Sequence, residues 1–345
     1  MRVVRSAPFP GAGAQKESTL MSQQAAAQPR IKIEEHEGGV IIARLAPDEL
    51  GLFGRDDAPE FIELVRRADR DPAIRAVVFT GSHPSRFISH AEISWLQEDG
   101  SAIPPVSTRV TSAVAKIAHW AARYRITRWV AARTPLMGGI QLDDLHSAYL
   151  RMATSSTIFV AALNGSALGI GAEISWACDL RLMAEGDHFI GHPEILMGIP
   201  PGSGGTQRMP RLIGAHRALV AILEGRPLPA EEALAVGAID EIVPADQLMS
   251  RAVERAAHLA ARPTEAIAAV KRAVNVGGSL SMDDGLHLER SEFLASLPQP
   301  KAQELMKGYL RDTAENGELP LYQPGGYAAA LQPGDAATGK EEVTA

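Results

Sequence analysis

The stretch GHPEILMGIPPGSGGTQR, residues 191–208, carries a glutamate directly after a proline and shortly before a loop rich in Gly and Pro. A carboxyl group held rigidly over a pocket can take up or release a proton during a reaction. The sequence therefore favours proton transfer as the role of Glu194.

A short pattern around this glutamate occurs three times in the chain. In each copy an apolar strand and a turn are followed by a small residue or a proline and then by Glu-Ile, at 91–93, 172–174 and 193–195. Repetition of one supersecondary unit would place these three corners side by side. Acidic residues are also common in the first turn of a helix, where they complement its dipole, so each glutamate taken singly also fits a structural role.

Two backbone N–H groups are candidates for binding a carbonyl oxygen. In the segment 162–182 a strand ends at a turn, and small residues including Gly169 would let the backbone approach a ligand before a helix begins near Glu173. The first N–H groups of a helix have no partner within it, so that of Ile170 is a candidate donor. The segment 86–96 repeats this plan, with Ala91 as the second donor. Two such donors stabilise an oxyanion by about 3 to 4 kcal/mol each.

Other site motifs are incomplete or absent in the sequence. The glycines after 165 lack the third glycine of a dinucleotide-binding turn, and the loop 202–205 lacks the Gly-Lys-Ser/Thr ending of a phosphate loop. The chain has neither a Gly-x-Ser-x-Gly elbow nor a His-Glu-x-x-His metal helix. His188, His192 and Glu194 alternate along a possible strand, so a metal site remains an alternative, although this spacing is not a specific signature.

Strand and helix patterns predict an α/β arrangement for the part of the chain that carries these corners. The segment 59–69 has helical apolar spacing after a proline, and the pattern is helical again from 214 onward. Strands are predicted at 31–35, 39–45, 76–81 and 157–163. The predicted regions are a disordered extension over 1–29, a core over 30–213 with a mostly helical insertion over about 100–150, a helical region over 214–322 and a disordered tail over 323–345.

The composition is that of an ordinary globular protein, with 46% hydrophobic and 22% charged residues. A net charge of −7 argues against a nucleic-acid-binding surface, which is normally basic. The single cysteine, Cys178, excludes an intrachain disulfide and fits a reducing, cytoplasmic location. The sequence has no apolar run of membrane-spanning length, so no membrane association is expected.

From about 31 to 310 the sequence resembles the crotonase, or enoyl-CoA hydratase/isomerase, superfamily. Four segments carry the resemblance: AVVFTGSHPSRFISHAEI, IFVAALNGSALGIGAEISWACDLRL, FIGHPEILMGIPPGSGGTQRMPRLIG and GRPLPAEEALAVGAIDEIVP. The resemblance implies an α/β fold built as a spiral of ββα units, with a C-terminal helical region that forms a homotrimer or a dimer of trimers. It also implies an acyl-CoA thioester as the ligand and no cofactor besides the coenzyme A of that substrate.

The same resemblance implies roles for individual residues. Glu173 and Glu194 match the two acid/base glutamates of the hydratases, and the backbone N–H groups of Ala91 and Ile170 match the oxyanion hole. In an apolar cleft two such carboxyls would not both ionise readily, because desolvation and like charge raise one pKa. Four further positions are expected to lie against the substrate, with the last often contributed across a subunit interface: Glu92, Gly169, Pro193 and Phe293.

The chain also departs from the family pattern. His90 and Ile170 stand where the family usually has glycine, and Asp312 stands where a lysine that contacts the cofactor is common. His90 fits either an extra proton-active group or a surface residue beside a helix start. The leading hypothesis is hydration of an enoyl-CoA. An isomerase, decarboxylase or hydrolase on the same fold is the alternative, and a non-catalytic scaffold is the third hypothesis.

Overall fold

Strands between residues 32 and 243 build a six-stranded β-sheet whose central members are apolar. The computed structural model describes residues 29–331 apart from 47, 123, 125, 126, 128, 130–133 and 135. The strand order is β1-β2-β4-β7-β9-β12, and all neighbours are parallel except β1 and β2. The strands are β1 Lys32–His36, β2 Val40–Leu45, β4 Ala76–Gly81, β7 Ile158–Leu163, β9 Leu180–Ala184 and β12 Glu241–Val243. The strands predicted from the sequence near 31, 39, 76 and 157 are confirmed.

Shorter strands form a second sheet and a separate strand pair. The second sheet has the order β11-β10-β8-β5, with β5, β8 and β10 parallel, and the pair joins β3 to β6. These strands are β3 Leu52–Phe53, β5 Arg86–Ile88, β6 His90–Ala91, β8 Ser166–Leu168, β10 Phe189–Gly191 and β11 Leu228–Pro229.

One ββα unit repeats along the chain. In each repeat a first strand joins the large sheet, a second joins the smaller sheet, and a helical turn follows. Three successive repeats end in α3 (Ile93–Ser101), α7 (Ile170–Ala177) and the 3₁₀ helix η2 (Glu194–Met197). Because consecutive units are neighbours in the sheets, their corners are stacked next to one another. The predicted spiral of ββα units is confirmed.

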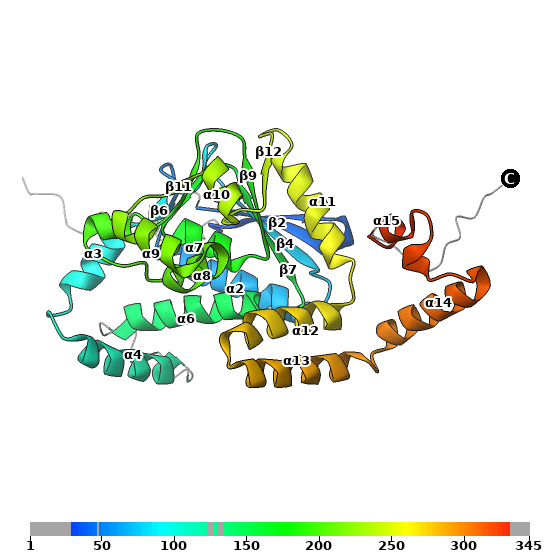
Figure 1. Ribbon diagram of the computed structural model, residues 1–345. Coiled ribbons are helices and arrows are strands. Elements are labelled where there is room, and N and C mark those ends of the chain that lie inside the picture. Colours follow the sequence, from blue (N-terminus) through cyan, green and yellow to red (C-terminus); the bar gives the residue numbers. More distant parts are fainter. Residues whose placement is uncertain are drawn as a thin grey trace, which may run out of the picture.

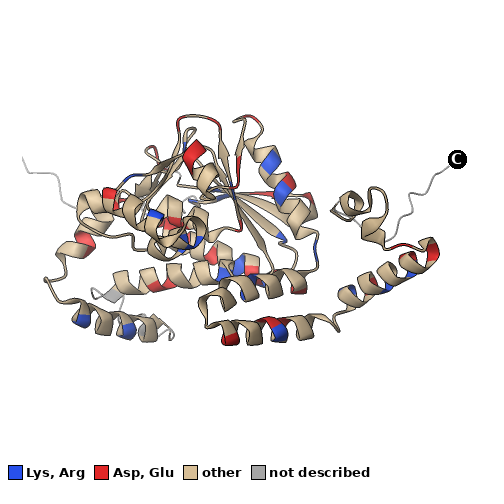
Figure 2. Cartoon of the chain, viewed as in Figure 1, with Lys and Arg blue, Asp and Glu red and all other residues tan. Residues whose placement is uncertain are grey.

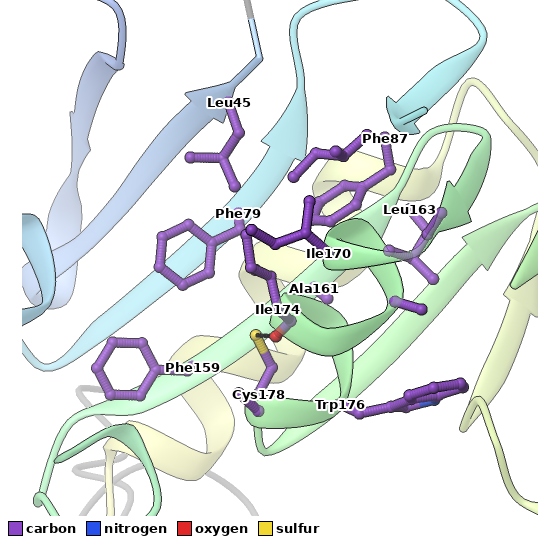
Figure 3. Close-up of a cluster of buried hydrophobic side chains, with 14 of the residues drawn as sticks. Leu45, Phe79, Phe87, Phe159, Ala161, Leu163, Ile170, Ile174, Trp176 and Cys178 are labelled. Carbon is purple, nitrogen blue, oxygen red and sulfur yellow. Dashed lines mark hydrogen bonds between the residues drawn. The ribbon is translucent and has the colours of Figure 1, made fainter. Parts of the chain in front are cut away.

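The central strands of the large sheet are buried on both faces. Along β7, Phe159, Ala161 and Leu163 face one core, and the residues between them face a second core closed by α11 (Leu248–Ala260). Period-2 alternation in a fully apolar strand is what a sheet covered on both sides requires. The first core continues from the sheet to α7, where Ile170 and Ile174 pack near Phe79 (Figure 3).

Helices surround the sheets and extend beyond them at one end of the molecule (Figure 1). α2 packs on α6, and α4 packs on the outer side of α6 as part of the mostly helical insertion. The C-terminal helices begin with α8 and end with α14 and α15, which project away from the sheets (Figure 1). These helices are α2 Asp57–Arg70, α4 Thr108–Ala122, α6 Leu136–Met152, α8 Gly205–Ile213, α9 Ala215–Glu224, α10 Ala230–Val236, α12 Thr264–Asn275, α13 Met282–Ser296, α14 Pro300–Asn316 and α15 Gly326–Leu331.

The structure bears on only part of the disorder predicted for the two chain ends. The expected disordered tail over 323–345 is wrong at its start, because residues 326–331 form α15 beyond the short 3₁₀ helix Pro320–Tyr322. The rest of that tail, 332–345, and nearly all of the extension over 1–29 lie outside the described residues.

Two further properties of the helices are their apolar length and their surface charge. In the part of the chain that the structure describes, no helix is both long and apolar enough to cross a bilayer. Acidic residues lie beside basic ones on the surface helices, as α11 and α13 show in Figure 2. This mixed pattern contrasts with the basic stripe typical of nucleic-acid-binding proteins.

Candidate active site

A cavity of about 300 Å³ lies where the repeated corners meet. Its wall includes Ala91 from the first corner, Ile170 and Glu173 from the second, and Pro193 and Glu194 from the third. Gly169 also lines it. Glu173 and Glu194 are 21 positions apart in sequence, so the stacking of ββα units is what brings them to one cavity.

Glu173 lies at the inner side of this cavity, on the first turns of α7. It is 2% exposed, and its Oε1 accepts hydrogen bonds from the backbone N–H groups of Ser203 (2.8 Å) and Gly205 (2.9 Å). Burial raises the pKa of Glu173, and the nearby Glu194 adds to this, while His192 and the two N–H donors act in the opposite direction. A raised pKa favours a carboxyl that can carry a proton near neutral pH.

Glu194 is the first residue of η2 and is held from one side by a histidine. Its Oε1 lies 3.2 Å from Nδ1 of His192, a side chain that is 1% exposed. Its Oε2 is buried and has no hydrogen-bond partner among the described residues. The same is true of Nε2 of His192, whose ring packs edge-on against Trp176 at 5.1 Å. We call Glu173, His192 and Glu194 the carboxylate cluster.

Gly169 shapes the approach to the two glutamates. It has φ 53° and ψ −119°, a conformation that side chains rarely tolerate, and a Cβ there would lie 3.1 Å from Oε1 of Glu194. The left-handed conformation falls on this glycine, so the next residue, Ile170, has an ordinary negative φ and can be a β-branched residue.

The two candidate oxyanion donors line the same cavity. Ile170 is the first residue of α7, so its N–H has no acceptor within that helix. Its side chain belongs to the core, near Phe79 and Phe87 (Figure 3), so the replacement of the usual glycine does not plug the cavity with a butyl group. Ala91 ends β6, and the neighbouring residues Ser89 and Glu92 donate to Gly51 and Phe53 across the strand pair.

A family model described as enoyl-CoA hydratase/isomerase matches residues 139–315, which is more than half of the chain. The chain belongs to the enoyl-CoA hydratase/isomerase family. Among similar proteins, the short-chain-enoyl-CoA hydratase of Clostridium acetobutylicum is 28% identical over 76% of this chain and 87% of its own length. The crotonyl-CoA hydratase of Syntrophomonas wolfei is 25% identical over 84% of this chain and 98% of its own length.

Solved structures agree on the fold of this enoyl-CoA hydratase/isomerase family member. The crystal structure of an enoyl-CoA hydratase from Bacillus anthracis superposes with a TM-score of 0.64 at 22% identity, covering 86% of this chain and 99% of that chain. A similarity of this kind shows the fold and leaves the chemistry to be argued from the site.

Two of the expected substrate-contacting residues lie away from the cavity in this family member. Glu92 does not line it, and its Oε1 accepts a hydrogen bond from the hydroxyl of Ser94 at 2.6 Å. Phe293 is 62% exposed on α13 and is likewise absent from the cavity wall. Within a single chain the structure therefore does not bring these two side chains to the site, and their contact with substrate stays a prediction.

His90 was predicted to be either a proton-active group or a surface residue beside a helix start, and the structure shows features of both. It is half-buried and lines the cavity, and its Nδ1 is 2.7 Å from the carbonyl oxygen of Ala91, which makes this nitrogen the donor. The ring therefore packs beside Ala91, the candidate oxyanion donor. Asp312 contacts the neighbouring Arg311.

The alternative metal site is not formed by the described residues. No three His, Cys, Asp or Glu side chains gather there in a way that could hold an ion. β10 spans only residues 189–191, so the prediction that His188, His192 and Glu194 alternate along one strand is wrong. His188 lines a separate pocket with Arg86 and Asp187.

Sequence reasoning missed two parts of this site. It treated His192 only as a possible metal ligand, although its position two residues before Glu194 is a signal for contact between the two side chains. It assigned no role to the insertion, yet Gly138, Gly139 and Leu142 of α6 line the cavity opposite Leu96 of α3. The consecutive glycines within an otherwise helical pattern are the signal there, because glycine in a helix suggests close packing or space for a ligand.

Proposed function

We propose that this protein adds water across the α,β double bond of an acyl-CoA thioester. The observation that carries the proposal is the presence of Glu173, Glu194 and the N–H groups of Ala91 and Ile170 around one cavity. Hydration of a conjugated thioester needs this combination: a base for the water, an acid for the α-carbon and donors for the thioester oxygen.

The reaction uses each group once. One carboxylate takes a proton from water as the water oxygen bonds to the β-carbon, and the electron pair of the double bond moves toward the thioester oxygen. The N–H groups of Ala91 and Ile170 stabilise the enolate that forms. The α-carbon then takes a proton from the other carboxyl group. The raised pKa of Glu173 supports this residue as the carboxyl that supplies the proton.

The cavity wall supports an apolar acyl group. Besides the polar corners, the wall consists largely of apolar side chains. They come from α3, from the end of η2 and from the segment after it, and include Ile93, Leu96, Met197 and Ile199. Such a surface binds a hydrocarbon chain through burial of apolar area.

Substitution of either glutamate tests the proposal. Glu173→Gln and Glu194→Gln should each lower kcat for a matched enoyl-CoA by about 10² to 10⁴-fold, because the amide cannot transfer the proton. Turnover would be followed by loss of the enoyl-thioester absorbance over a panel of chain lengths. The matched control is Glu185→Gln, the same change at an exposed glutamate, which should leave turnover unchanged.

Product analysis in ¹⁸O-labelled water separates hydration from the other reactions of this fold. Hydration places the label on the β-carbon of the acyl group, whereas movement of the double bond leaves the acyl group unlabelled. Wild-type rates in both Gln variants, or an unlabelled product, would overturn the proposal. A chain that binds no acyl-CoA in titration calorimetry would favour the non-catalytic scaffold.

A further inference from the structure

His192 lies behind the glutamates and outside the cavity wall. Its side chain is 1% exposed and it does not line the cavity, whereas Glu173 and Glu194 both do. It therefore contacts the carboxyl group of Glu194 from the protein side, and it is not placed to touch a ligand in the cavity. This placement makes it a candidate for positioning and not for direct catalysis.

Tight packing holds the imidazole ring of His192 in place. Trp176 of α7 packs against its edge, and the start of α8 closes the other side. At Gly205 a Cβ would lie only 2.0 Å from Nε2 of His192 and 3.1 Å from Oε1 of Glu173. The glycine thus lets one backbone segment approach the histidine and donate to Glu173 at the same time.

The hydrogen bond from His192 makes the two oxygens of Glu194 different. When Glu194 is ionised, the N–H at Nδ1 donates to Oε1, and Oε2 is left without a partner among the described residues. Glu173 shows the same division, since both of its backbone donors bind Oε1. Each carboxyl group therefore has one oxygen fixed by the protein.

We propose that His192 is a positioning residue of the hydration site: its contact with Oε1 of Glu194 fixes the orientation of that carboxyl group at the cavity wall. This inference rests on the proposed hydration and adds a residue to it. Among the described residues Nε2 is buried without a partner, so the ring is held there by its packing and by its contact with Glu194. A purely structural histidine would be expected to use both nitrogens.

Two substitutions separate the hydrogen bond from the charge of the ring. His192→Asn keeps an N–H donor close to the position of Nδ1, whereas His192→Phe keeps a ring of similar volume and removes the donor. His192→Phe should lower kcat by about 10- to 100-fold with little change in KM, because a small misplacement of a reacting group has that cost. His192→Asn should recover most of this loss. The matched control, His188→Asn, changes a half-buried histidine of a separate pocket and should leave kcat unchanged.

The pH profile of kcat/KM gives a readout that a structural role would not move. The charged and titratable groups around His192 are Glu194 on its own segment, Glu173 on α7, and Tyr149 of α6 and Arg208 of α8, which act on Glu173. His192 lowers the pKa of Glu173, so removing the ring should move the limb that reports Glu173 to higher pH in both variants.

The outcomes distinguish this inference from the proposed function. Reduced kcat in His192→Phe, recovery in His192→Asn and a shifted limb in both would support it, provided that thermal melts show folded protein. If the Gln variants of the glutamates lose activity but both His192 variants keep wild-type kcat and pH profile, only the positioning role is wrong. If the wild-type protein hydrates no enoyl-CoA, the proposed function itself is wrong.

Discussion

Two buried groups of charged side chains in this chain are built differently. Lys271 of α12 donates to Oδ2 of Asp179 (2.8 Å) and to the carbonyl oxygen of Thr157 (2.9 Å), and it lies over the ring of Phe159. Asp179 also accepts the N–H of Phe159. The carboxylate cluster, by contrast, leaves Nε2 of His192 and Oε2 of Glu194 without partners in the described part of the chain.

The difference separates polar groups that stabilise the fold from polar groups that are left able to react. A buried ion pair in which no buried atom of the described residues lacks a partner holds elements together, here α12 against the start of β7. An unpaired buried atom costs free energy of folding and persists where it has another use, such as proton transfer. The Lys271–Asp179 pair should therefore respond to mutation in stability, and the carboxylate cluster in turnover.

The largest effect on stability is expected when the satisfied pair is broken. Lys271→Met removes the ammonium group and leaves Asp179 and the carbonyl of Thr157 without it. Because 19% of the Asp179 side chain is exposed, we expect the lower end of the usual range, a loss of about 3 kcal/mol in the free energy of unfolding. Urea denaturation measures this loss, and kcat per folded molecule should be unchanged. A large drop in kcat without a loss of stability would show that this pair serves turnover and not the stability of the fold.

A smaller loss is expected when both members of the pair are replaced. Asp179→Asn combined with Lys271→Met removes the uncompensated charge while the amide oxygen can still accept the N–H of Phe159. The double variant should regain at least about 1 kcal/mol relative to Lys271→Met alone, as contacting residues couple by about that amount. The same urea titration gives the coupling energy, and strict additivity of the two single changes would contradict it.

The smallest expected effect is a gain in the stability of the folded protein. The folded protein raises the pKa of Glu173 above its ordinary value of 4.5, so the native state binds the proton more tightly than the unfolded chain. Stability is then lost as pH rises from about 4.5 through the folded pKa. Glu173→Gln should remove this loss and raise the melting temperature at neutral pH, with a difference that vanishes at acid pH. A variant that melts below the wild type at neutral pH would show that Glu173 contributes to stability there.

Local patterning was sufficient to predict four of the six strands of the large sheet and to single out the two glutamates, because strand alternation and the repeated Glu-Ile corner are short-range signals. The predicted helix start near Glu173 was three residues late, since the helix begins at Ile170 directly after the left-handed Gly169. The pattern of turns and helix starts and the resemblance to the family both indicated Ala91 and Ile170, and the structure brings these residues to the cavity with both glutamates.

Other features depend on contacts that no local pattern encodes. The ring of His192 packs against Trp176 of α7 and against the start of α8. The insertion reaches the cavity only because α6 packs between α2 and α4. The expected contacts of Glu92 and Phe293 with substrate came from the family alone and stay untested predictions. The helix α15 was missed because its composition of Gly, Ala and Tyr resembles that of an unstructured tail.

Ile170 belongs to two parts of the molecule at once, with its N–H at the cavity and its side chain among Phe79 and Phe87. The proposed donor is therefore anchored in the close-packed core, and close-packed interiors transmit strain. Repacking of the interior, for example by thermostabilising substitutions around Phe79, would consequently retune the reaction from a distance, and engineering of this scaffold has to treat its hydrophobic interior as a determinant of rate.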